Sequence, residues 1–196
     1  MDRGMKATLF ALFVISFSLL NAEPKVVSAD QIQLRGKVGS QLAYLPNQDT
    51  PFTGKATKSH PDGWKLAERN FKDGKLHGTE TMWYGNGRKR VEANHKDDQK
   101  HGLLTGWYEN GQKQLEANYK DGKEDGAWTS WYSNGQKTAE VNFKDGKQDG
   151  LGTDWYMNGQ KEREGHFKDG KMDGAWIEWH KDGTEKNASP TRTGKK

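Results

Sequence analysis

The feature that most constrains the fold is an internal repeat of 24 residues, which recurs without insertion or deletion along most of the chain. One copy is the stretch Tyr108–Trp131, which reads YENGQKQLEANYKDGKEDGAWTSW. A fixed period of this length is typical of an array in which each unit packs on its neighbours. We therefore expect one elongated domain rather than two globular ones.

The composition fits such an array and argues against a large globular core. Of the 196 residues, 31% are hydrophobic, 24 are glycine and none is cysteine. A solenoid needs less apolar mass because it buries only a narrow seam, supplied here by eight Trp, six Tyr and seven Phe. The absence of cysteine excludes disulfides and thiolate metal sites. The finely mixed charge, net +4, disfavours nucleic-acid binding.

Residues 1–22 have the three parts of a secretory signal peptide. Arg3 and Lys6 precede an apolar run, 7–20, and Ala22 is a candidate cleavage residue, with Ala29 as a second. The apolar run is shorter than the roughly 20 residues that cross a bilayer. We therefore expect a secreted or periplasmic protein of the cell envelope. Retention of the segment as an anchor is the alternative.

The rest of the sequence divides into three parts. Residues 23–51 are expected to form a linker and a cap hairpin, because turn glycines separate two strand-like stretches. Residues 52–185 contain a half-repeat and five full units, and 186–196 form a polar basic tail that we expect to be disordered. Terminal units of an array are expected to be atypical because they cover an exposed sheet edge.

Each unit is predicted to contain two strands and two turns. The first turn is Asn-Gly or Asp-Gly, which predicts a type I′ hairpin turn with positive φ at both residues. The glycines of these turns are Gly63, Gly87, Gly111, Gly135, Gly159 and Gly183. The second turn is Lys-Asp-Gly-Lys, but one copy has Asp98 in place of the glycine. A positive φ at Asp98 would cost about 1 kcal/mol, so we expect Asp98→Gly to raise the melting temperature.

The strand between the two turns alternates, so one face of the sheet should be apolar and the other wet. Leu115 and Ala117 belong to the apolar side of one copy, and Glu116 belongs to the wet side. Arg163 and Gly165 interrupt the pattern in the last full copy and predict thinner burial there. The wet-face glutamates, one per copy, are expected to pair with lysines rather than to bind a cation.

Two aromatic columns run along the array, because the second strand of most units ends in Trp-Tyr. Adjacent strand residues point to opposite faces, so one ring enters the seam and the other lines the opposite surface. We assign the tryptophans to the structural seam: Trp83, Trp107, Trp131, Trp155 and Trp179. We assign the tyrosines to a partner-binding face: Tyr84, Tyr108, Tyr132 and Tyr156. An aromatic face would also suit a membrane surface or a glycan.

The combination of Lys-Asp-Gly-Lys, Asp-Gly or His-Gly, and Asn-Gly turns between aromatic-ended strands resembles the MORN repeat. The likeness is to the bacterial variant in the YwqK family of toxin–antitoxin antitoxins. The segment Tyr44–Gly54, YLPNQDTPFTG, also resembles the stretch that leads into the repeats of that family. The resemblance spans about Ile32 to Gly183. It implies a non-catalytic interaction scaffold, and it offers no catalytic, cofactor-binding or metal-binding residues to carry over.

The sequence therefore predicts an all-β fold, an elongated single-layer antiparallel meander of 24-residue β-hairpin repeats of the MORN type. The motifs H-E-x-x-H and G-x-S-x-G are absent, and we expect no enzyme activity, no cofactor and no metal. The expected function is protein–protein binding by an extracytoplasmic scaffold. The alternatives are an antitoxin or immunity-type protein that occludes a toxin or effector, and a binder of membrane or glycan surfaces.

Overall fold

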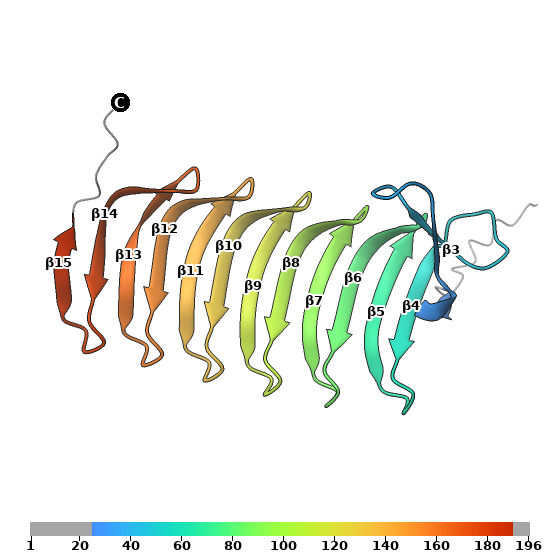
Figure 1. The fold of residues 1–196 in the computed structure, drawn as a ribbon, viewed down its shortest axis with the longest axis horizontal. Helices are drawn as coiled ribbons and strands as arrows, with labels where there is room; N and C mark the ends of the chain where they lie inside the picture. The colour runs from blue at the N-terminus through green and yellow to red at the C-terminus, as the bar shows by residue number, and fades with distance from the viewer. Residues whose placement is uncertain (1–24, 190–196) are drawn as a thin grey trace, which may run out of the picture.

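The computed structural model describes residues 25–189 and confirms the all-β prediction (Figure 1). A 13-stranded sheet has the order β1, β4, β5 and onward to β15, and β2 and β3 form a separate two-stranded sheet. Strands β4 to β15 follow one another as antiparallel neighbours, whereas β1 pairs with β4 in parallel. The long sheet is a single open layer that extends along the longest axis of the molecule (Figure 1).

The strands of the full units alternate between eight and nine residues. They are β5 Lys65–Lys72, β6 Lys75–Trp83, β7 Lys89–Lys96, β8 Gln99–Trp107, β9 Lys113–Lys120, β10 Lys123–Trp131, β11 Lys137–Lys144, β12 Lys147–Trp155, β13 Lys161–Lys168 and β14 Lys171–Trp179. The outer elements are β1 Val26–Ser28, the 3₁₀ helix η1 Ala29–Gln31, β2 Gln33–Arg35, β3 Leu42–Tyr44, β4 Gly54–Ser59 and β15 Glu185–Ser189.

The two ends differ from the sequence-based division in detail. The signal-peptide prediction falls on residues outside the described range, and Ala29, the second candidate cleavage residue, begins η1. At the other end β15 continues the sheet past 185, because Lys186 and Ser189 pair with Glu178 and Trp176 of β14. Within residues 25–189, none of the helices is long and apolar enough to cross a membrane.

The two faces of the sheet carry different residues, as the alternation predicts. On one face, here called the apolar face, opposed residues form a row across the strands: Ala56, Arg69, Glu80, Ala93, Leu104, Ala117, Trp128, Val141, Gly152 and Gly165. On the other, here called the ladder face, threonine and glutamate alternate: Thr57, Glu68, Thr81, Glu92, Thr105, Glu116, Thr129, Glu140, Thr153 and Glu164.

The prediction of a type I′ turn at Asn-Gly is wrong, and the type I′ geometry occurs at the other turn. In the turn after β6, φ is positive at Gly87 (80°) but not at Asn86. The Gly87 N–H donates to the Tyr84 carbonyl at 3.0 Å, and the Tyr84 N–H donates to the Arg88 carbonyl at 2.8 Å. This is a three-residue loop with a single left-handed glycine, which leaves Asn86 in ordinary backbone geometry.

Both central residues have positive φ in the Lys-Asp-Gly-Lys turns, for example Asp121 at 49° and Gly122 at 83°. The Gly122 N–H donates to the Lys100 carbonyl of the preceding unit at 2.9 Å. Asp98 has a φ of 70°, so the predicted left-handed conformation is confirmed. However, the Asp98 carboxylate also accepts a hydrogen bond from the Leu76 N–H at 2.8 Å, which a glycine could not do.

The N-terminal end of the sheet is covered by a small core of its own. Ala43, Leu45, Phe52 and Ala56 are buried together, and the Phe52 ring lies 5.8 Å from that of Phe71. Backbone hydrogen bonds tie this cap to the Lys-Asp-Gly-Lys turn between β5 and β6, because the Ala43 N–H donates to the Gly74 carbonyl at 2.8 Å. The parallel strand β1, which no sequence pattern predicts, supplies the outermost strand of the sheet.

The prediction of thinner burial is confirmed at Arg163, which is exposed, but it is wrong at Gly165. Gly165 is buried because the indole of Trp176 lies directly over it, where a Cβ atom would overlap the ring. Trp176 is 8% exposed and packs edge-on against Phe167, with ring centroids 4.9 Å apart. A glycine that looks like a gap in the pattern therefore makes room for the largest side chain.

Candidate functional site

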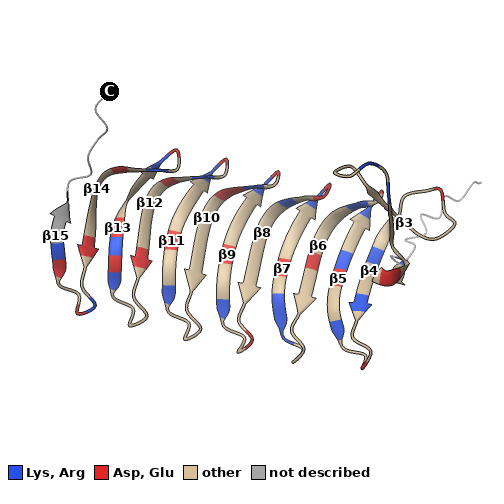
Figure 2. Ribbon diagram, viewed as in Figure 1, with Lys and Arg blue, Asp and Glu red and all other residues tan. Residues whose placement is uncertain are grey.

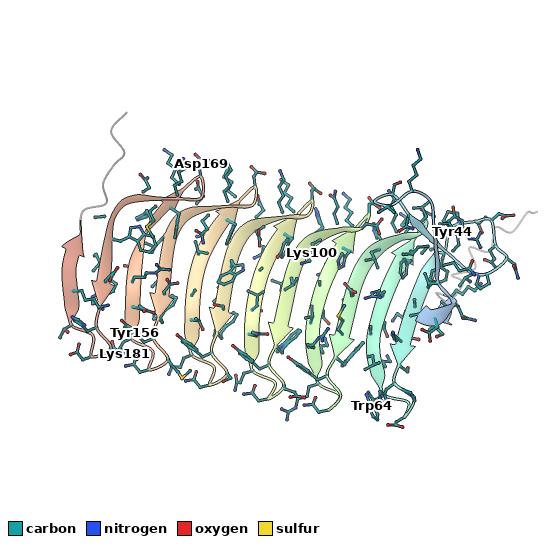
Figure 3. All side chains as sticks on the ribbon, viewed as in Figure 1. Tyr44, Trp64, Lys100, Tyr156, Asp169 and Lys181 are labelled. Carbon is teal, nitrogen blue, oxygen red and sulfur yellow. The ribbon has the colours of Figure 1, made fainter. Side chains whose placement is uncertain are left out.

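The tyrosine column, which the sequence assigns to partner binding, makes hydrogen bonds inside the array. Each hydroxyl donates to the carbonyl of the tryptophan one unit further on, 23 residues away, at 2.7–3.0 Å: Tyr84 to Trp107, Tyr108 to Trp131, Tyr132 to Trp155 and Tyr156 to Trp179. The rings are half-buried. At the end of the column, Lys181 Nζ lies 5.7 Å from the Tyr156 ring (Figure 3). Partner binding by these rings stays a prediction.

The tryptophan column lies half-exposed on the ladder face, where it alternates with lysines. Trp107 pairs with Lys113 across the strands, and Lys113 Nζ in turn lies 5.7 Å from the Trp131 ring. The same arrangement recurs in each unit, for Lys65 over Trp83, Lys89 over Trp107, Lys137 over Trp155 and Lys161 over Trp179. Figure 2 shows these lysines as a line of basic residues at the starts of β5, β7, β9, β11 and β13. The column therefore packs between cations rather than in an apolar seam.

Each of these lysines also pairs with the glutamate three residues on, as the sequence predicted for the wet face. The pairs are Lys65–Glu68, Lys89–Glu92, Lys113–Glu116, Lys137–Glu140 and Lys161–Glu164. Hydrogen bonds from Lys55 and Lys65 hold the pKa of Glu68 below its usual value of 4.5. Since each of the five lysines has a carboxylate partner, the ladder face carries mixed charge rather than one sign.

The apolar face has a hollow of about 170 Å³, here called the Gly152 hollow. Gly152 forms its floor opposite Val141, and the rings of Trp128 and Trp176 stand on either side. A Cβ at Gly152 would lie 2.6 Å from the Phe167 ring, so only glycine leaves this space. The two tryptophans lie two repeat units apart in the sequence, and neither ring belongs to the columns that the Trp-Tyr pattern predicts.

The rim of the Gly152 hollow is polar and carries an ion pair. Arg163 pairs with Asp154 at the rim, and the Arg163 guanidinium lies 5.5 Å from the Trp176 ring. The indole N–H of Trp176 is buried without a hydrogen-bond partner in the described part of the protein. An unpaired buried donor is costly.

A larger cavity, about 510 Å³, lies on the same face under the cap, and we call it the cap cavity. Its walls are mostly apolar and include Ile32, Phe71 and Leu76, and its floor carries the ion pair of Arg69 with Glu80 at 2.6 Å. His95 stands beside this pair, with Nε2 3.7 Å from the Glu80 carboxylate.

His95 is the second buried group whose ring nitrogen lacks a partner within residues 25–189, in this case at Nδ1. Burial lowers the pKa of the imidazole below its usual 6.5, although the Glu80 carboxylate acts in the opposite direction. The Gly152 hollow and the cap cavity therefore each have an ion pair in the lining. Next to each pair lies a buried nitrogen without a hydrogen-bond partner within residues 25–189.

The described residues contain no group of three or more His, Asp or Glu side chains arranged to hold a metal ion. The turn histidines instead pair with aspartates of the following unit, as in His101 Nδ1 and Asp121 at 3.2 Å. The geometry on both faces thus offers recognition surfaces: rings, hollows and paired charges.

Two segments of the protein match a known family. Residues 100–121 and 124–145 match the family described as MORN repeat variant, which covers β8 with β9 and β10 with β11. No curated protein matches the sequence. The match supports a repeat module of the kind that commonly serves in binding or as a scaffold, and it gives no support to the YwqK antitoxin assignment.

Proposed function

We propose that this protein is a non-catalytic module that acts outside the cytoplasm and binds a protein partner along the apolar face. The observation that most favours this proposal is the pair of hollows on one face, each beside a buried nitrogen without a partner within residues 25–189. Apolar walls with a few polar groups are the usual make-up of a recognition site.

The partner is best described as a protein segment with apolar anchors and a mixed polar surface. Both hollows carry a basic and an acidic side chain, Arg69 with Glu80 and Arg163 with Asp154. An anionic membrane or polymer would be complemented by one sign of charge, whereas a polypeptide supplies donors and acceptors together.

The distance between the hollows sets the size of the segment. The cap cavity lies at β5 and β6 and the Gly152 hollow at β12. Strands spaced at about 4.8 Å place them roughly 30 Å apart. An extended segment of about nine residues, or a helix of about 20 residues, would span both.

The proposal is tested by affinity capture from envelope and culture-fluid extracts with the full-length protein as bait. Truncation of Trp128 to Ala removes one wall of the Gly152 hollow and should weaken capture about ten-fold or more, as for a hot-spot residue. Leu151→Ala is the matched control, because Leu151 is 44% exposed and lies on the opposite face of β12. Equal loss with both variants, or no loss with Trp128→Ala, would rule out the apolar face.

The proposed localisation outside the cytoplasm is tested on the same protein by mass spectrometry of its N-terminus. Recovery from the envelope or medium as a polypeptide that begins after Ala22 or Ala29 supports export and cleavage. Recovery in the cytoplasm with the segment intact contradicts it. A captured partner that is a toxin, and that the protein inhibits, would extend the proposal to an immunity-type role.

A further inference from the structure

Four turns along one edge of the sheet have the sequence Asn-Gly, and each asparagine side chain links two units. Oδ1 accepts from the backbone N–H two residues on, at 3.0–3.1 Å. Nδ2 donates to a carbonyl 23 residues on, at 2.7–3.2 Å: Asn86 to Glu109, Asn110 to Ser133, Asn134 to Met157 and Asn158 to Lys181. We call the second bond the asparagine bridge.

We propose that these four Asn-Gly turns are modification sites, which deamidate when the bridge opens and thereby uncouple neighbouring repeats. In this reaction the glycine nitrogen attacks the asparagine Cγ and forms a ring, and the bond between Cγ and Nδ2 breaks. The proton of the attacking nitrogen passes to the departing amine, which leaves as ammonia. Water then opens the cyclic imide to aspartate or isoaspartate. Water is the only co-reactant, and all four asparagines are exposed to it.

The stacked repeats restrain the attack by holding both reacting groups. In the turn after β10, the Gly135 N–H already donates to the Tyr132 carbonyl at 2.9 Å. The Asn134 side chain is fixed at both ends, with Oδ1 held by the Gln136 N–H and Nδ2 by the Met157 carbonyl. For Cγ to reach the Gly135 nitrogen, these three hydrogen bonds must be given up together. Thermolabile asparagines in an unfolded polypeptide have no such restraint.

The last turn shows what the product does to the structure. Asp182 occupies the equivalent position there, and its Oδ1 accepts from both the N–H and the hydroxyl of Thr184, at 2.9 and 2.6 Å. These donors lower the pKa of the Asp182 carboxyl, so the turn itself accommodates a carboxylate. A carboxylate has no N–H to donate to the next unit, however, and its second oxygen would lie against the backbone carbonyl oxygen that accepts the asparagine bridge. Deamidation therefore keeps the turn and removes the bridge.

The test is peptide mapping by mass spectrometry of the full-length protein held at mildly alkaline pH, folded and in denaturant. We expect the four Asn-Gly sites to deamidate at least about ten-fold more slowly when folded, because three hydrogen bonds oppose the attack. The internal controls are the strand asparagines that glycine does not follow: Asn70, Asn94, Asn118 and Asn142. Equal deamidation rates at the Asn-Gly sites in the folded and denatured protein would overturn the proposal that the stacked repeats restrain the reaction.

The uncoupling is tested with Asn134→Asp, which mimics the product without isoaspartate. We expect a lower melting temperature and faster hydrogen exchange at the Met157 turn and the units beside it. Asp182→Asn is the control, because β15 is the last described strand and no later turn within residues 25–189 offers a carbonyl for a bridge. An unchanged melting temperature in Asn134→Asp would contradict the proposal. If that variant does not fold, aged wild-type protein separated by charge supplies the same comparison.

Discussion

The two faces of the sheet both carry tryptophans, but they use them in different ways. On the apolar face Trp176 is 8% exposed because Gly165 leaves room beneath its ring. On the ladder face Trp155 pairs across the strands with Lys161 and is only half-buried, with Lys137 over its ring. The depth at which a ring is buried therefore depends on the size and charge of its cross-strand neighbour.

In this single-layer sheet, the apolar face contributes most of the folding stability, whereas the ladder face presents charged and aromatic groups to solvent. The apolar face obtains its burial from large residues set against small ones, as with Trp128 opposite Ala117. The ladder face replaces apolar burial by cation–π contacts and ion pairs, which contribute little each when exposed to solvent. We expect mutations on the two faces to differ accordingly.

The largest contrast is expected between two tryptophan truncations. Trp176→Ala removes a nearly buried indole and its edge-on contact with Phe167, and it should cost about 3–5 kcal/mol of unfolding free energy. Trp155→Ala removes a half-buried ring and one cation–π contact, and it should cost about 1–2 kcal/mol. Chemical denaturation of both variants measures the difference. Equal losses would show that the two faces are energetically alike.

A glycine pair on the apolar face sharpens the packing argument. Gly165→Ala would drive a methyl group into the Trp176 indole and should cost about 1–3 kcal/mol. Gly106→Ala is the matched control, because its nearest neighbour, the Leu115 Cβ, would be 3.8 Å away. We expect the control to be neutral in thermal melts. A neutral result for Gly165→Ala would mean that the indole moves freely.

Acid should affect the two faces in different pH ranges. The pKa of His95 is lowered in the folded protein, so its contribution to stability is present above 6.5 and is lost as the pH falls below that value. The groups that face it are Glu80, Lys100, Asp98 and Arg69. Phenylalanine occupies the same place in other units, at Phe71 and Phe143. When melting temperature is measured against pH, His95→Phe should therefore lack the decrease that the wild type shows below pH 6.5.

The ladder face should respond at lower pH. Lysine partners hold the pKa of Glu68 and Glu164 below 4.5, so their contribution is present above 4.5 and is lost as the pH falls through the folded-state values. The acid phase near this range should survive in His95→Phe. If His95→Phe abolished both the decrease in stability below pH 6.5 and the decrease below pH 4.5, the two decreases could not be assigned to separate faces.

A smaller effect is expected from a single ladder pair. Glu116→Gln leaves Lys113 without its carboxylate at 2.6 Å but keeps the cation–π contact with Trp131. The loss should be below about 1 kcal/mol and should shrink in high salt. Denaturant midpoints at low and high ionic strength measure it. A large, salt-independent loss would show that the ladder face contributes as much unfolding free energy per side chain as the apolar face.

The smallest effect is expected at the turn edge that both faces share. Asp98→Gly relieves a left-handed residue, worth about 1 kcal/mol, but it also removes the hydrogen bond to the Leu76 N–H, worth a similar amount. We therefore expect a change of less than about 0.5 kcal/mol, in place of the clear stabilisation that the sequence predicts. Asp98→Asn keeps the acceptor and serves as the control in the same melts. A rise of several degrees for glycine would show that backbone strain dominates.

Much of the architecture was predictable because it depends on local chemistry. The 24-residue period, the turn glycines and the alternation of Leu115, Glu116 and Ala117 specify hairpins with one apolar face. The pairing of each ladder lysine with the glutamate three residues on is also local. The type I′ assignment failed because Asn-Gly supports either loop, and here the loop has three residues, closed by the hydrogen bond from the Tyr108 N–H to the Gln112 carbonyl.

The candidate site was less predictable because it depends on contacts between strands far apart in the sequence. The hollow over Gly152 exists because Trp128 and Trp176 stand two units apart on one face, which no single repeat reveals. The cap cavity needs η1 and the segment of the β2–β3 hairpin to lie against residues of β5 and β6, such as Phe71 and Glu80.

The repeated hairpin, its period and the positions of its turns follow from the amino-acid sequence, because backbone conformation and alternation are set within a few residues. The folded sheet was needed to establish which rings are buried, which hydroxyls and amides link the units, and where the apolar face is hollow. Those outcomes depend on the residue opposite each ring, as Gly165 lies beneath Trp176 and Lys161 lies beside Trp155, and cross-strand register sets that neighbour.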